Sequence, residues 1–111
     1  MKNKRPKILA LLKKARHELH VYRKTRKFTN LSQACEKTWV AFNLTIEYVK
    51  NKEIRTSKGI KDAALELNLL GLYREARYLH VIHYEGSPGV DDDELISDVI
   101  RTGSEIEALV I

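Results

Sequence analysis

The chain has 111 residues, a net charge of +5 and one cysteine. This length is typical of one domain, so we expect residues 1–111 to form a single domain with a buried core. The lone cysteine excludes an intramolecular disulfide, and the apolar run ILALL is too short for a signal peptide or a membrane span, so we expect a cytoplasmic protein that makes no membrane contact.

The charge is divided unevenly along the chain. Residues 1–30 hold eleven basic and one acidic side chain, a balance of +10, whereas residues 31–111 have a balance of −5. A block of cations this dense is typical of a surface that faces phosphates. It is equally typical of a solvated helix face, and the sequence leaves both interpretations open.

The first predicted helix spans residues 7–26. Its apolar residues recur at three- and four-residue steps and form one stripe, which leaves the basic residues on the other sides. If the helix contacts phosphates, the binding residues are expected to be Lys13, Lys14, Arg23 and Lys24.

The second predicted helix spans residues 31–50, with Asn30 as its N-cap and Gln33 completing an imperfect capping box. Its apolar arc is wide enough to touch several neighbours, which predicts a central helix with Trp39 and Phe42 largely buried. Cys35 belongs to the same arc and is predicted to be a core residue rather than a nucleophile.

The rest of the chain predicts three more helices. Ser57 is expected to cap a third helix that ends at Gly71, and residues 72–85 form a fourth. The segment GSPGV then breaks the chain, and a fifth helix begins with acidic residues at Asp91 and is weakened at Gly103. Because no strand pattern of any length occurs, the predicted fold is all-α, an antiparallel up-and-down bundle of four to five helices.

The fourth predicted helix contains the stretch REARYLHVIHYEG, residues 74–86, and its first residue, Arg74, is expected to be a further binding residue. His83 falls in the apolar arc of this helix, so packing explains it and a phenylalanine should replace it without cost. On the adjacent arc, Arg77, His80 and Tyr84 are spaced three and four residues apart and can converge. Arginine can hold a phosphate, histidine can move a proton and tyrosine can stack on a base, so catalysis, binding and simple packing all stay open.

Metal and cofactor sites find little support in the sequence. His80 and His83 are three residues apart, but no Asp, Glu or Cys near them completes a recognised ligand pattern. The chain has no phosphate-binding loop and no dinucleotide motif. We therefore expect no metal and no cofactor.

Three segments together resemble the HEPN superfamily: LSQACEKTWVAFNLTIEYV, the helix start SKGI, and EARYLHVIHYEG before an acidic fifth helix. More narrowly, Leu79-His80 and Tyr84-Glu85-Gly86 are similar to the archaeal PaREP branch, in which an aromatic residue more usually stands at the position of His83. The resemblance implies a helical bundle that commonly pairs into dimers. It also implies that an arginine followed a few residues later by a histidine can form the active site of a metal-independent ribonuclease. Two pairs fit that spacing, Arg77 with His83 and Arg74 with His80.

Two functions follow as expectations. The first is a non-catalytic module that binds a nucleotide, RNA or a protein partner through the basic helix and a groove formed by the Arg, His and Tyr side chains. The alternative is a metal-independent, toxin-like ribonuclease that uses Arg77 with His80 or His83, assisted by Tyr84. We also expect a homodimer, because the second and fifth helices carry more apolar residues than one inner face needs.

Overall fold

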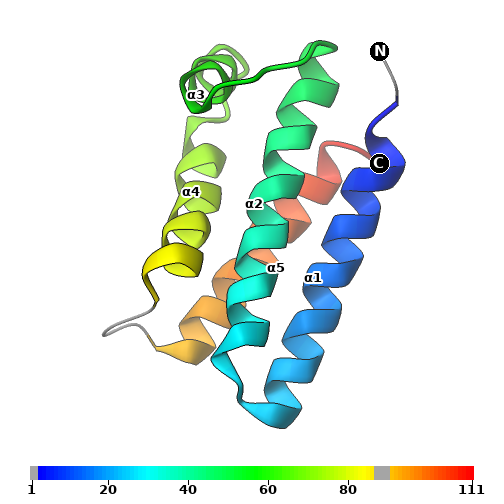
Figure 1. Ribbon diagram of the computed structural model, residues 1–111. Helices are drawn as coiled ribbons and strands as arrows, with labels where there is room; N and C mark the ends of the chain where they lie inside the picture. Colours follow the sequence, from blue (N-terminus) through cyan, green and yellow to red (C-terminus); the bar gives the residue numbers. More distant parts are fainter. Residues whose placement is uncertain (1–2, 87–90) are drawn as a thin grey trace.

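The computed structural model describes residues 3–86 and 91–111, and these fold into five helices without a strand. The helices are α1 (Arg5–Thr25), α2 (Phe28–Lys50), α3 (Ser57–Glu66), α4 (Leu70–Glu85) and α5 (Asp92–Ala108). Figure 1 shows α1, α2, α4 and α5 running alternately up and down along the long axis, with the short α3 at one end. The predicted all-α antiparallel bundle is confirmed. None of the described helices is both long and apolar enough to cross a membrane.

Helix α2 is the centre of the bundle, as predicted, because it packs against each of the other four helices. Trp39 is 8% exposed and Phe42 is fully buried. Their rings lie nearly parallel, 6.1 Å apart, and both contact Tyr73 of α4. The apolar end of the bundle near α3 is built around these three rings.

The core continues toward the opposite end of the bundle, where aliphatic side chains of α1, α2, α4 and α5 meet. Cys35 lies in this part and is fully buried, which confirms its prediction as a core residue. Burial away from water raises the pKa of its thiol to about 12. Cys35 is therefore a protonated packing group at neutral pH.

Helix α2 begins earlier than predicted, and the capping role of Asn30 is wrong. Arg26 adopts a left-handed conformation with φ of 56°, so the chain reverses at once and the helix resumes at Phe28. Asn30 lies within the first turn, where its side-chain amide donates to Glu18 Oε2 at 2.9 Å. A turn of two residues replaces the expected loop.

The boundaries of α3 and α5 also differ in detail from those predicted. Thr56, not Ser57, caps α3, since its Oγ1 accepts a hydrogen bond from the Gly59 amide at 3.0 Å. The helix ends at Glu66, and the left-handed residue after it is Asn68, so Gly71 lies inside α4 instead of ending α3. The break predicted at GSPGV falls mostly on residues 87–90, outside the described residues, and the Asp91 side chain caps α5.

Helix α1 is joined by polar contacts at three levels to α5 and to the residues that follow it. The Tyr22 hydroxyl donates to the Asp92 carboxylate, a bond that raises the pKa of the tyrosine. Arg16 pairs with Glu107 at 3.0 Å, and Arg5 Nε donates to the Val110 carbonyl at 2.6 Å. These contacts hold the basic helix in a defined orientation on the bundle.

Candidate functional site

The imidazole of His80 is held between α4 and α2. Its Nδ1 lies 2.9 Å from Glu36 Oε2, and its ring stacks on Trp39 with 4.9 Å between centroids and an interplanar angle of 27°. The histidine is thus oriented on one edge by a carboxylate and on one face by an aromatic ring. A carboxylate that orients an imidazole is an arrangement that proton-transfer sites use.

His83 makes polar contacts, and its predicted role as an apolar packing residue is wrong. Its Nδ1 lies 3.0 Å from the Ser32 carbonyl oxygen, which can only accept, so Nδ1 donates. The Ser32 hydroxyl in turn donates to the His83 carbonyl at 3.3 Å. The apolar position is taken by Ile82, which is 5% exposed, and His83 lies at the edge of the stripe against α2.

Both histidines face the same carboxylate, because His83 Nε2 also lies 4.0 Å from Glu36 Oε2. The ring of Tyr84 meets His80 and His83 edge-on, with centroid distances of 4.9 and 5.2 Å, and is 73% exposed. We call Ser32, Glu36, His80, His83 and Tyr84 the Glu36 cluster. It is a half-buried polar seam between α2 and α4 with an aromatic ring at its outer edge.

Neither predicted arginine joins the Glu36 cluster. Arg77 is exposed, and within residues 3–86 and 91–111 its side chain makes no hydrogen bond or ion pair. Arg74 is exposed and borders a pocket between α4 and α5. Of the expected convergence of Arg77, His80 and Tyr84, only His80 and Tyr84 come together, and His83 joins them instead of the arginine.

The predicted binding residues of α1 form an exposed basic face, in which Lys13 and Lys24 share one stripe and Lys14 and Arg23 lie on opposite sides of it. Lys13, Lys14, Arg23 and Lys24 are all solvent-exposed. The only acidic residue of this helix, Glu18, is half-buried and is occupied by Asn30 of α2 and by Lys37 at 3.7 Å. No carboxylate of α1 therefore interrupts the basic face.

Two histidines extend this face, a role that the sequence interpretation did not assign to them. His17 and His20 are exposed and lie on the same stripe as Lys13 and Lys24, at steps of three and four residues. From Lys13 to Lys24 the stripe is about 16 Å long, given a rise of about 1.5 Å per residue. Their three- and four-residue spacing from Lys13 and Lys24 is the sequence signal from which both histidines could have been assigned to this face.

Sequence reasoning also missed Ser32 and Glu36. They are four residues apart on α2, so they lie on one side of that helix and interrupt its apolar arc. This polar pair is a signal in the sequence, but nothing local indicates which helix supplies its partners. Among the described residues, no group of three or more His, Cys, Asp or Glu side chains is placed to hold a metal ion.

Comparison of the chain with known protein families, with curated proteins and with solved structures found no match.

Proposed function

We propose that this protein is a non-catalytic RNA-binding module and that the exposed basic face of α1 is its contact surface. The observation that carries the proposal is the exposure of Lys13, Lys14, Arg23 and Lys24 on a helix whose only carboxylate is already occupied. Lysine and arginine in this state attract phosphates, and bound phosphates release their counterions.

The shape of the face favours a polymer over a free nucleotide. A stripe of about 16 Å, at about 1.5 Å per residue, is longer than one nucleotide and suits several successive phosphates of a strand. On α4, which does not contact α1, Tyr84 is 73% exposed and offers a ring on which a base of a long strand can stack. The resemblance to HEPN proteins points to RNA as the polymer.

The proposal predicts binding that weakens steeply with salt. If four phosphates are neutralised, the affinity for a single-stranded RNA should fall about fiftyfold between about 50 and 200 mM salt. Reversing the charges at Lys13, Lys14, Arg23 and Lys24 to glutamate should abolish most of the binding and flatten the dependence on salt. Fluorescence anisotropy of a labelled oligonucleotide measures both quantities.

A matched control distinguishes RNA binding by the α1 face from a general effect of the protein's net charge. Lys52, Arg55, Lys58 and Lys61 are also exposed, and they lie near α3 instead of on α1. Their reversal to glutamate changes the net charge by the same amount and should leave most of the affinity. If both variants lose binding equally, or if the α1 variant binds like the unaltered protein, the basic face of α1 only keeps the protein soluble.

The remaining expectations belong to the same proposal. We propose that the chain is a HEPN-like module of the PaREP type, supported by its helix order and by Leu79-His80 and Tyr84-Glu85-Gly86. We also propose a homodimer in the cytoplasm. The partly exposed apolar residues of α2 and α5 available to such a dimer are Val40, Val49 and Ile100.

The His80–Glu36 pair favours one alternative, a metal-independent ribonuclease. Glu36 holds His80 at Nδ1, and the other ring nitrogen of His80 is then the group that moves a proton. The test is RNA degradation in the presence of a chelator. Loss of activity in both Arg77→Ala and His80→Asn would establish the ribonuclease, and asparagine is chosen because it covers more of Trp39 than alanine. Equal degradation by both variants and the unaltered protein would exclude it.

A further inference from the structure

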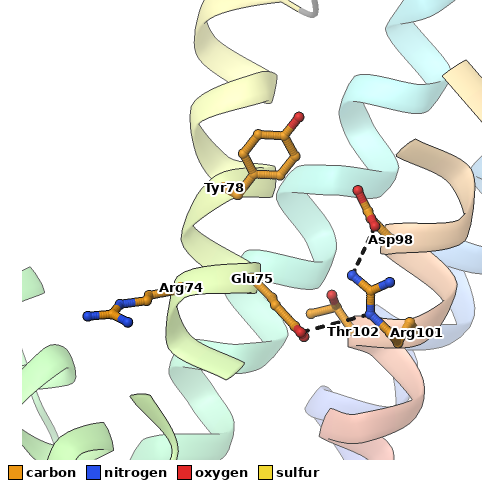
Figure 2. A pocket seen from close by; sticks show the side chains of 6 residues that line it. All are labelled: Arg74, Glu75, Tyr78, Asp98, Arg101 and Thr102. Atoms are coloured by element: carbon orange, nitrogen blue, oxygen red, sulfur yellow. Dashed lines mark hydrogen bonds and ion pairs between the residues drawn. The ribbon is translucent and has the colours of Figure 1, made fainter. Parts of the chain in front are cut away.

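A pocket of about 240 Å³ lies between α4 and α5, on a different side of α4 from the Glu36 cluster. Figure 2 shows its lining, in which Glu75 and Thr102 point into the space between the two helices and the Arg74 side chain points away from it. The other lining residues are Tyr78, Asp98 and Arg101.

Two buried oxygen atoms in this pocket lack hydrogen-bond partners. Thr102 is fully buried, and neither its hydroxyl oxygen nor Glu75 Oε2 has a partner among the described residues. These are the two buried side-chain atoms of the described chain in this condition, and both line the same pocket. Leaving a polar atom buried and unpaired is costly, so such atoms in native proteins call for an explanation.

The cation already present does not satisfy these atoms. Arg101 donates to Asp98 Oδ1 at 2.9 Å and lies 3.8 Å from Glu75 Oε1, the other oxygen of the Glu75 carboxylate. Burial raises the pKa of Glu75, and the Glu105 carboxyl raises it further, both by its negative charge and by a hydrogen bond that favours the protonated form of Glu75. The pocket thus holds a carboxylate whose charged form lacks a sufficient positive partner.

Negative charge extends beyond the pocket along α5. An adjoining hollow shares Asp98 and Arg101 with the pocket and is also lined by Asp93 and Glu94. Although the protein as a whole is basic, this side of α5 presents mostly carboxylates. A positively charged ligand is therefore favoured here over an anion.

We propose that this pocket binds a small organic cation through a primary ammonium group, which donates hydrogen bonds to Glu75 Oε2 and Thr102 Oγ1. The three N–H bonds of an ammonium group suit a carboxylate and a hydroxyl side by side. The ring of Tyr78, 40% exposed, provides an apolar wall for the alkyl part of the ligand. This site is independent of the proposed RNA surface, which lies on another helix and has the opposite charge.

The test uses n-butylammonium as the probe and tetramethylammonium as its matched control, because the latter carries the same charge without an N–H donor. Nuclear magnetic resonance should show saturable shifts of the backbone amides of residues 74–78 and 98–102 with n-butylammonium. Tetramethylammonium should bind about tenfold more weakly or worse, since it cannot make a charged hydrogen bond. Equal binding of the two ions, or no saturation by n-butylammonium up to about 10 mM, would overturn the proposal.

Substitutions of Glu75 and Thr102, which supply the two unpaired oxygen atoms, test the same proposal from the side of the protein. Glu75→Gln and Thr102→Val should each weaken n-butylammonium binding about tenfold, whereas Thr102→Ser should keep it, because serine retains the hydroxyl. Glu75 is only partly buried, so its variant remains informative if Thr102→Val fails to fold. Unchanged binding by Glu75→Gln would contradict the assignment.

Melting temperatures provide a second readout with its own control. Thr45 is as fully buried as Thr102, but its hydroxyl donates to the Ala41 carbonyl at 2.8 Å. Thr45→Val should lower the melting temperature and leave n-butylammonium binding unchanged, whereas Thr102→Val should melt no lower than the unaltered protein, because it removes an unpaired group. If Thr102→Val is destabilised as much as Thr45→Val, the Thr102 hydroxyl is already satisfied and the proposed site is not there.

Discussion

Replacing Trp39 with alanine should destabilise the protein by about 3–5 kcal/mol, the usual cost of removing a large buried aromatic side chain. Trp39 is 8% exposed and its ring contacts Phe42, Tyr73 and His80. The substitution therefore opens a cavity between α2 and α4 and also removes the surface on which His80 stacks. Urea unfolding followed by far-ultraviolet circular dichroism measures the loss. Tryptophan fluorescence is unsuitable, since Trp39 is the only tryptophan of the chain.

Val40 provides the control for this prediction. It is the next residue of α2 and is 36% exposed, so Val40→Ala should cost about 1 kcal/mol at most, because it removes only two carbon atoms and these are partly in contact with water. A loss below about 1 kcal/mol for Trp39→Ala would mean that the ring is not part of the core.

His83→Phe should destabilise the protein by about 0.5–1.5 kcal/mol, because it removes a part-buried hydrogen bond between α4 and α2. The imidazole Nδ1 of His83 donates to the Ser32 carbonyl and lies 2.8 Å from the Ser32 hydroxyl. A phenyl ring fills similar space but cannot donate, and it would lie against the Glu36 carboxylate. Chemical denaturation of the variant measures the effect, which is opposite to the tolerance expected from the helical periodicity alone.

His83→Asn is the matched variant, since its side-chain amide can place a donor near the position of Nδ1. It should lose less stability than His83→Phe. A double-mutant cycle with Ser32→Ala should show that the two positions are coupled. If His83→Phe changes the free energy of unfolding by less than about 0.5 kcal/mol, His83 is a packing residue after all.

The secondary structure of this protein is determined locally. The recurrence of apolar residues at three- and four-residue steps predicted all five helices, and the wide apolar arc of α2 predicted its central place and the burial of Trp39 and Phe42. The helix boundaries were harder to predict, because a threonine, a serine and an asparagine near a helix start can all cap it. Which residue does so depends on where the chain turns, as Thr56 and Asn30 illustrate.

What only the tertiary structure decided is which polar side chains meet. The periodicity of α4 placed Arg77, His80 and Tyr84 on one arc, but the partners of the histidines, Glu36 and Ser32, lie 44 and 51 residues away on α2. The pocket between α4 and α5 likewise joins Glu75 to Thr102, which are distant in the chain. The spacing of residues along one helix determines which side chains share a face. The rotation of that helix against its neighbours depends on the packing of the whole core, and it determines what that face contacts.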